Sequence, residues 1–415
     1  MNVCNDAYLE EMNRSAYRQF AERVFFSPVA PGVRSHANAV IKPPVHPSQD
    51  KDYDEHGSIF GRGGVYGEDG KHIPASGQSA LNMRQRVAGG PDLEGKPDFP
   101  FVSERVMYGN FFVKQWGHFL LDVVGRLWHA LKDKEIRIVF TTWEGRELRI
   151  DGNYRDFLSM AGIDAGRISI INEPTRFKEV VIPDSSIVPG SHYTREYENL
   201  MDTVVANAGK PEVQKGKKTY CSRRMLAKAG WTEFGEDTVE SCFVRSGYRP
   251  VSMEKLPLRE QIAELNSSEE IAMVCGSLSH NLLFARNANR VYVLNKTYRL
   301  NQHQFMINTI AKSKAVFVDA FVSPLPVLMG CGPFIMRPTD PFLAFARENG
   351  IAAEHVDQRI PLLLRLKYYK RYFELYKRHL LKGKKVRETD NKELEPSLGT
   401  VRAAYAAYLK RARKY

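Results

Sequence analysis

The sequence predicts an α/β protein in which two domains, each built on a parallel β-sheet with helices on both faces, lie against each other. Two observations predict this class. Apolar strand-like segments alternate with helical segments over residues 116–208 and again over residues 219–294, as expected where each parallel strand needs a helical crossover to the next. Between them, the polar, Lys-rich segment 209–218 breaks the periodicity, and we place the domain boundary there.

An irregular lead over residues 1–56 is predicted to precede the first domain. It contains a short polar helix over residues 7–23 and a Pro-rich connector. Beyond it, residues 64–66 and 71–73 flank the turn Glu68-Asp69-Gly70. Two extended segments around an Asp-Gly turn are typical of a β-hairpin.

The elements of the two domains follow in chain order. The first domain, residues 57–210, is predicted to contain helices over 116–132, 154–162 and 191–208 and strands over 136–141, 168–171 and 179–182. The second domain, residues 211–345, is predicted to contain strands over 219–222, 248–252, 271–275 and 291–294 and helices over 236–246, 258–266 and 278–285. A basic helical tail over residues 346–415 completes the prediction.

Composition argues against several classes of protein. The 415 residues, 43% of them hydrophobic, are enough for two domains with cores of their own. Residues 1–18 have no apolar run, unlike a signal peptide, and three prolines interrupt the apolar stretch 315–336, which favours a buried strand and loop over a membrane span. The five cysteines are scattered without Cys-x-x-Cys spacing, so neither a disulfide framework nor a zinc site is expected and the predicted location is the cytoplasm.

The net charge of +12 is concentrated in the tail. Residues 361–415 hold 16 Lys or Arg and five Asp or Glu, a net charge of +11. A predicted helix over residues 362–382 interleaves these cations with tyrosines. Two interpretations stay open: binding to anionic headgroups on the inner face of the cytoplasmic membrane, or packing of the tyrosines on the body. A nucleic-acid partner is not expected, because the near-neutral body has no recognised reader motif.

One predicted helix combines an imidazole with a carboxylate. Within residues 116–132, His118, Asp122 and Arg126 follow at i, i+4 and i+8 and form a polar stripe on an otherwise apolar surface. A His with an Asp one turn away can take a proton from an attacking hydroxyl while the carboxylate stabilises the imidazolium. The same spacing is that of an ordinary helix ion pair, so a catalytic and a structural interpretation both stay open.

The second domain supplies groups that bind anions. The segment Ser222-Arg223-Arg224 follows a predicted strand and should lie at the carboxyl edge of the sheet, where open α/β folds bind ligands. Gly276-Ser277 follows another strand and begins a predicted helix, whose free amides and dipole would form a phosphate seat, with His280-Asn281 on the first turn. Together the two sets of residues predict an enzyme that uses a phosphate-activated donor.

A metal site is not expected. The run Asp50-Lys51-Asp52-Tyr53-Asp54 holds acidic pairs of the metal-binding type, but no βα unit precedes it, which favours an acidic loop. The glycines of residues 61–64 lack the third glycine of a dinucleotide fingerprint, which argues against a nucleotide-dependent oxidoreductase.

In order and spacing, several segments resemble glycosyltransferase family 61. They are Tyr220-Cys221-Ser222-Arg223, Gly247-Tyr248, Glu260-Gln261, and Gly276-Ser277 through His280-Asn281 to Phe284; Gly117 to Asp122 with Arg126-Leu127-Trp128 is similar to the first-domain signature. The resemblance covers about residues 57–340. It implies a two-domain GT-B fold and inversion at the anomeric carbon without a cofactor or bound metal. The implied substrates are a nucleotide-sugar donor, expected to be UDP-linked, and a saccharide or lipid-linked saccharide acceptor.

By position, the resemblance implies that Ser222 and Arg223 contact the donor diphosphate, that Glu260 lies near the nucleoside, and that His118 with Asp122 faces the acceptor. Many members carry His-Gly-Ala where this chain has Cys275-Gly276-Ser277, with its histidine later, at His280. Which imidazole contacts phosphate and which residue is the base therefore stay open. The expected function is transfer of a sugar in bacterial surface or capsular polysaccharide synthesis. The alternative is a non-catalytic scaffold that binds nucleotide-sugar or polysaccharide in a membrane-associated assembly.

Overall fold

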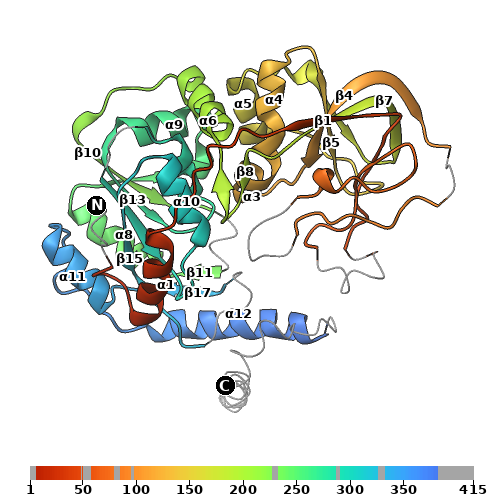
Figure 1. Ribbon diagram of the computed structural model, residues 1–415. Coiled ribbons are helices and arrows are strands. Elements are labelled where there is room, and N and C mark those ends of the chain that lie inside the picture. Colours follow the sequence, from red (N-terminus) through yellow and green to blue (C-terminus); the bar gives the residue numbers. More distant parts are fainter. Residues whose placement is uncertain are drawn as a thin grey trace.

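The structure is a computed structural model that describes residues 6–47, 49, 58–78, 85–94, 98–226, 232–286, 290–325 and 332–381. Over these residues the chain forms two main β-sheets with helices packed on them (Figure 1). Both sheets contain parallel strands, which confirms the α/β class.

The first sheet has seven strands and is only partly parallel. Its strands are β1 (Val33–Ala37), β2 (Val40–Lys42), β3 (Gly64–Tyr66), β4 (Phe101–Phe111), β5 (Arg137–Thr141), β6 (Ile168–Ile171) and β7 (Thr175–Pro183). Strands β7, β4, β5 and β6 pair in parallel, whereas β1 and β2 pair antiparallel with β7, and β3 pairs antiparallel with β2. The hairpin at the Asp-Gly turn is confirmed, because the Ile73 N–H donates to Val65 O at 2.8 Å.

Among the described residues, helices cover one face of this sheet, in contrast to the predicted helices on both faces. On one face α4 (Leu127–Lys132), α5 (Gly152–Met160) and α6 (Arg195–Ala208) contribute to the core. The core of the other face consists of strand residues such as Tyr108 and Ile182, with Ile73 and Ala75 partly buried against it. On this face the segment around η1 (Pro74–Ser76) contributes Ile73 and Ala75, while β2 and β3, expected to be irregular or a separate hairpin, extend the sheet as antiparallel strands.

The second sheet matches the expected class in full. Its strands are β10 (Gln214–Ser222), β12 (Arg249–Ser252), β13 (Ser268–Val274), β14 (Arg290–Asn295) and β15 (Ala315–Asp319), all parallel in the order β12-β10-β13-β14-β15. Alternate residues of β13 face opposite cores, as the period of a strand requires. One core includes α8 (Glu236–Arg245) and α11 (Asp340–Glu348), and the other α9 (Leu258–Ser267) and α10 (Gln302–Ile310).

The polar segment between the sheets is shorter than predicted. Strand β10 begins at Gln214, so Lys215, Lys217 and Lys218 belong to the sheet rather than to a linker over 209–218. Two of these lysines pair with carboxylates: Lys217 Nζ lies 3.0 Å from Glu264 Oε2, and Lys218 Nζ lies 3.4 Å from Glu270 Oε1. Acidic partners distant in sequence thus make a lysine-rich strand stable.

The N-terminal lead contacts both sheets. Helix α1 (Glu11–Ala21) packs on the second sheet, where the Tyr17 ring lies 5.4 Å from Phe305 and 5.8 Å from Phe317. Asn13 Nδ2 donates to Asp319 Oδ1 at 2.8 Å, and burial raises the pKa of Asp319 to about 6. The chain then runs across to β1 in the first sheet (Figure 1).

Helix α12 (Leu362–Leu381) packs on the body of the protein through some of its tyrosines. Tyr368, Tyr372 and Phe373 are buried in a cluster with Leu325 and Ile335, so the tyrosine-bearing face packs on the body. Among the described side chains of α12, Leu362, Leu363 and Leu366 are exposed. Residues 382–415 lie outside the described residues. Among the described helices, none combines the length and apolarity needed to cross a bilayer.

Candidate active site between the two sheets

The predicted helix over 116–132 forms, but its winding is irregular. It starts as α3 (Trp116–His118), widens to a π-helical turn over Phe119–Val123, tightens to a 3-10 turn over Val124–Arg126 and continues as α4. Single π-helical turns inside helices are frequent at functional sites. Here the turn holds His118 Nδ1 2.5 Å from Asp122 Oδ2.

A buried arginine fixes the carboxylate of this pair. Asp122 is buried, and its Oδ2 also accepts from Arg86 Nε at 3.1 Å. The Gln78 side-chain amide donates to the Asp122 main-chain oxygen at 3.1 Å. Because the carboxylate accepts at His118 Nδ1, the imidazole carries its proton there and Nε2 presents a lone pair. The His118 side chain is 30% exposed, so that nitrogen can meet a substrate.

Arg126 does not extend the polar stripe, contrary to the predicted spacing. Its side chain is buried, with Nε donating to Asn110 Oδ1 at 2.5 Å and Nη2 to Ala75 O at 2.7 Å. Nη1 also donates to Pro183 O. Burial lowers the pKa of Arg126 to about 10. The change from π to 3-10 winding breaks the i, i+4 register, and Arg126 ties together the first domain instead of facing the site.

The two sequence segments that predicted a site are in direct contact. Trp116 Nε1 donates to Asn281 Oδ1 at 2.5 Å, and Asn281 Nδ2 donates to Gln261 Oε1 at 2.9 Å. Gly117 lies against the second sheet so closely that an added Cβ would be 2.9 Å from His280 Nδ1 and 3.1 Å from Ser277 Oγ. Position 117 therefore requires glycine. His118 is the next residue in the chain, so it lies close to this contact.

His280 is a positioning group rather than a base. It is buried, and its Nε2 accepts from the Asn301 amide at 3.0 Å, because Asn301 Oδ1 already accepts from the His303 main-chain N–H at 3.1 Å. Burial lowers the pKa of His280 to about 3 and that of His303 to about 4. Both imidazoles are neutral near pH 7, and the Nε2 of His280 is occupied. Of these histidines, His118 is the one with an available ring nitrogen on a carboxylate-backed imidazole.

Arg223 and Gly276 lie together at the carboxyl edge of the second sheet. Arg223 makes a bidentate pair with Glu233, Nε to Oε2 at 2.7 Å and Nη2 to Oε1 at 2.9 Å. Although burial alone would raise it, the neighbouring Lys296 and Arg223 hold the pKa of Glu233 below its usual value. A Cβ on Gly276 would lie 3.9 Å from Arg223 Nη1 and 3.6 Å from Lys296 Nζ. The two cations therefore flank Gly276.

The α-helix whose N-terminus was expected to bind phosphate does not form. After Gly276 the chain forms a six-residue 3-10 helix, η6 (Ser279–Phe284), rather than an α-helix over 278–285. The Gly276 N–H is occupied, because it donates to Ser279 Oγ at 3.1 Å. Ser279 in turn donates to Gln304 Oε1 at 2.6 Å, which holds the turn against α10. Charged side chains, not helix amides, provide the positive potential here.

Ser222, Arg224 and Glu260 have different environments in the second domain. Ser222 is buried, with its Oγ accepting from the Arg224 N–H at 3.3 Å, and the Arg224 guanidinium donates to Glu240 Oε1 on α8 at 2.9 Å. Glu260 is exposed in the first turn of α9. Its neighbour Gln261 is the buried residue that joins the Trp116–Asn281 network.

Sequence reasoning missed three charged residues of this site. Lys296 directly follows β14, as Arg223 follows β10, so the strand-end argument applied to Arg223 would have found it. Arg86 and Glu233 lack such a signal, because Arg86 lies outside the named strands and helices and Glu233 is in the two-residue strand β11 (Glu233–Phe234).

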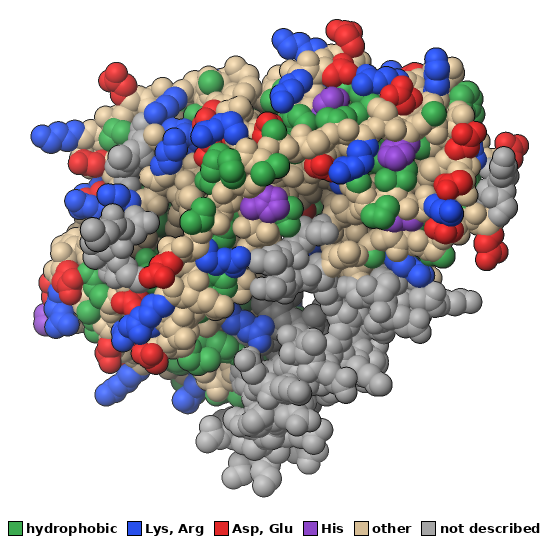
Figure 2. Space-filling view, viewed as in Figure 1, with side chains coloured by type: hydrophobic (Ala, Val, Ile, Leu, Met, Phe, Trp, Pro, Cys, Tyr) green, Lys and Arg blue, Asp and Glu red, His purple; other side chains and the backbone are tan. Residues whose placement is uncertain are grey.

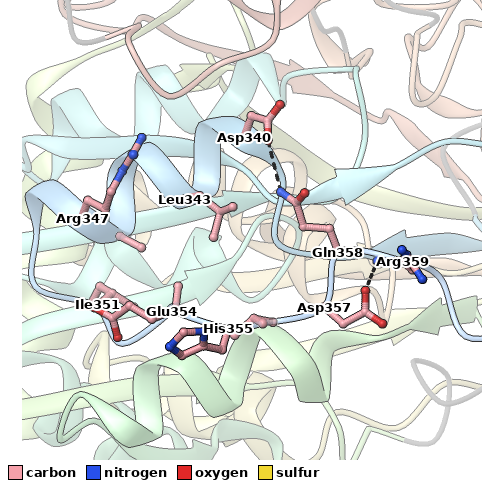
Figure 3. A pocket seen from close by; sticks show the side chains of 12 residues that line it. Asp340, Leu343, Arg347, Ile351, Glu354, His355, Asp357, Gln358 and Arg359 are labelled. Carbon is pink, nitrogen blue, oxygen red and sulfur yellow. Dashed lines mark hydrogen bonds between the residues drawn. The ribbon is translucent and has the colours of Figure 1, made fainter.

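Among the described residues, no group of three or more His, Cys, Asp or Glu side chains is arranged to hold a metal ion. The acidic run Asp50 to Asp54 lies outside the described residues. A cavity of about 600 Å³ shares no residue with the site: it lies between α11 and the segment 351–359, where Gln358 Nε2 donates to Asp340 Oδ1 at 3.2 Å (Figure 3).

The family model described as Glycosyltransferase 61 matches residues 116–292. No curated protein matches the chain. A solved structure, the dodecameric iron-containing heptosyltransferase TibC in complex with ADP-D-beta-D-heptose, is similar at 12% identity, with 86% of this chain and 100% of that chain covered and a TM-score of 0.23, too low to carry an argument. The segment that holds His118, Arg223, Gly276 and His280 is therefore similar to glycosyltransferase family 61, and this match supports a glycosyltransferase.

Proposed function

We propose that the protein is an inverting, metal-independent glycosyltransferase that moves a sugar from a nucleotide-sugar, expected to be UDP-linked, to a hydroxyl of a growing surface or capsular polysaccharide. The single observation that carries this proposal is the contact of Gly117 with Ser277 and His280. It brings the His118–Asp122 pair of one sheet next to the Arg223 and Gly276 edge of the other. A base and an anion-binding edge are what direct displacement at a phosphate-activated carbon needs.

In the proposed reaction the acceptor hydroxyl attacks the anomeric carbon from the face opposite the nucleotide. The bond from the acceptor oxygen to this carbon forms as the bond to the phosphate oxygen breaks, which inverts the configuration. The hydroxyl proton passes to His118 Nε2, and the Asp122 carboxylate, 2.5 Å from Nδ1, stabilises the imidazolium. The electron pair of the broken bond leaves with the nucleoside diphosphate, whose charge Arg223 stabilises.

Release of nucleoside diphosphate in EDTA tests this function. We expect the full-length protein to release nucleoside diphosphate from one of a panel of nucleotide-sugars, faster with acceptor, and EDTA to change the rate less than twofold, because Arg223 supplies positive charge in the absence of metal. Measuring released UDP or GDP checks this. A scaffold that only binds would release none, and a rate abolished by EDTA and restored by Mn²⁺ would instead assign a metal to the site.

A peripheral membrane location is also proposed, on the exposed face of α12. Leu362, Leu363 and Leu366 are 61%, 65% and 48% exposed, and the flanking Arg365 and Lys367 are exposed as well. Apolar side chains flanked by cations fit an anionic lipid surface, because the leucines can enter the acyl boundary while the cations meet the headgroups. On the face drawn in Figure 2, by contrast, acidic and basic side chains intermingle.

Negative charge introduced on α12 tests this surface without removing the packed helix. We expect the double variant Leu363→Glu, Leu366→Glu to lower binding to phosphatidylserine vesicles about tenfold or more, since each change removes apolar contact and adds repulsion. Cosedimentation at low and high salt measures it. The matched control is Val24→Glu, Val29→Glu, because these valines are 85% and 72% exposed elsewhere. Equal binding by all three proteins would remove α12 as the docking surface.

A further inference from the structure

A lysine that no motif marked completes the anion-binding edge of the second sheet. Lys296 follows the last residue of β14, Arg223 follows the last residue of β10, and Gly276 comes two residues after β13. These three strands are adjacent and parallel, in the order β10-β13-β14. The three residues therefore lie side by side at the carboxyl edge, where open parallel sheets bind ligands.

One carboxylate holds both cations. Lys296 Nζ donates to Glu233 Oε1 at 2.6 Å, and this oxygen also accepts from Arg223 Nη2 at 2.9 Å. The side chains of Lys296, Arg223 and Glu233 are 13%, 14% and 4% exposed. The Lys296 ammonium also lies 4.8 Å from the centre of the Phe334 ring. These contacts fix the ammonium and the guanidinium on either side of a single carboxylate.

The seat keeps positive charge and unused donors. Two cations and one carboxylate leave it net positive, although burial lowers the pKa of Lys296 and Glu233 opposes that effect. Glu236, which accepts the Arg223 main-chain N–H at 2.9 Å, cancels only part of this charge because burial raises its pKa to about 7. Of the three Lys296 protons one is committed to Glu233, and among the described residues Arg223 Nη1 makes no hydrogen bond. Both groups border the space left by the missing side chain of Gly276.

We propose that Lys296 is a second phosphate-binding cation of this site, and that Lys296 and Arg223 together bind the two phosphates of a diphosphate group over Gly276. Glu233 Oε1 accepts from both cations, at 2.6 Å and 2.9 Å, and so holds them close to each other. The inference rests on the proposed function only in taking this diphosphate to be that of the nucleotide-sugar donor. A lysine suits such a position because its ammonium acts as a point charge, while the planar guanidinium of Arg223 gives directional contacts.

Calorimetric titration of the full-length protein with inorganic pyrophosphate and with orthophosphate tests the seat without any sugar. We expect Lys296→Met to raise the Kd for pyrophosphate at least tenfold and the Kd for orthophosphate less than threefold, because one phosphate can still bind Arg223. Lys296→Arg should restore pyrophosphate binding to within threefold of the unmodified protein. Lys178→Met, which removes an exposed lysine of β7 in the other sheet, is the matched control and should bind as the unmodified protein does.

Unchanged pyrophosphate binding by a folded Lys296→Met protein would overturn the proposal, as would an unmodified protein that binds no pyrophosphate. Folding is checked by the thermal midpoint, which should hold because Glu233 keeps its bidentate partner Arg223. The outcome is separate from that of the proposed function. Equal sugar transfer by Lys296→Met and the unmodified protein would contradict the role of Lys296 and still support a transferase. Pyrophosphate binding that depends on Lys296, in a protein without sugar transfer, would support the phosphate-binding role and contradict the transferase.

Discussion

Replacing His118 with asparagine is expected to lower kcat for sugar transfer by a factor of about 100 to 10,000, the usual contribution of a positioned general base. Asparagine can keep a hydrogen bond to Asp122 from nearly the place of His118 Nδ1, but it has no nitrogen that accepts a proton at the position of Nε2. The change therefore removes the chemistry while leaving the buried Asp122–Arg86 pair with its polar neighbour. Steady-state rates at saturating donor and acceptor measure it.

Donor binding provides the control for His118→Asn. Because the proposal puts His118 on the acceptor side, the variant should bind nucleoside diphosphate within about threefold of the unmodified protein. A kcat within threefold of normal would show that another group takes the proton, and that His118 and Asp122 form a structural ion pair, the alternative that the i, i+4 spacing left open.

Arg223→Ala is the second change with a large expected effect. A fixed donor aimed at charge that develops on the leaving group is worth about 100- to 1,000-fold in kcat, and Arg223, whose side chain is 14% exposed, has its Nη1 beside Gly276. We expect a loss of that size in kcat measured at saturating donor. Arg223→Lys should recover only part of it, since an ammonium cannot form the bidentate pair with Glu233.

Arg290→Ala is the matched control for Arg223→Ala. Arg290 is the first residue of β14, at the amino end of the same parallel sheet, and pairs with Glu270 at 3.2 Å. The Arg290 side chain is 62% exposed and Glu270 keeps Lys218 as a partner, so this change tests loss of an arginine from the same sheet with little effect on stability. Near-normal turnover in a folded Arg223→Ala protein would remove Arg223 from the leaving-group role.

The sequence predicted the second sheet because the alternation of its strands and helices follows local rules. Parallel strands end at a common edge, so residues that follow them, such as Arg223 and Gly276, meet whatever the loops do. The proximity of His118 and Asp122 was predicted from the pitch of a helix alone. Despite the π-helical turn, His118 Nδ1 lies 2.5 Å from Asp122 Oδ2. The alternation of residues in β13 likewise sets which side chain faces which core.

What could not be predicted depends on partners distant in sequence. Asp122 contacts Arg86, which no periodic pattern places, and Arg126 turns inward because the helix winding changes after Asp122. The 3-10 geometry after Gly276 follows from the Ser279 side chain, which takes the Gly276 N–H and binds Gln304 on another helix. Local propensity does not encode these tertiary contacts.

Helix α1 has a consequence for how the protein is made. Its Asn13 meets Asp319 across 306 residues of chain, so α1 cannot complete its packing until strand β15 has been made. Contacts so far apart in sequence close slowly, because a long loop must be ordered before they form. A fragment cut at residue 210 would separate Tyr17 from Phe305 and Phe317 and leave those rings to water. The intact polypeptide, rather than either half, is the unit to express.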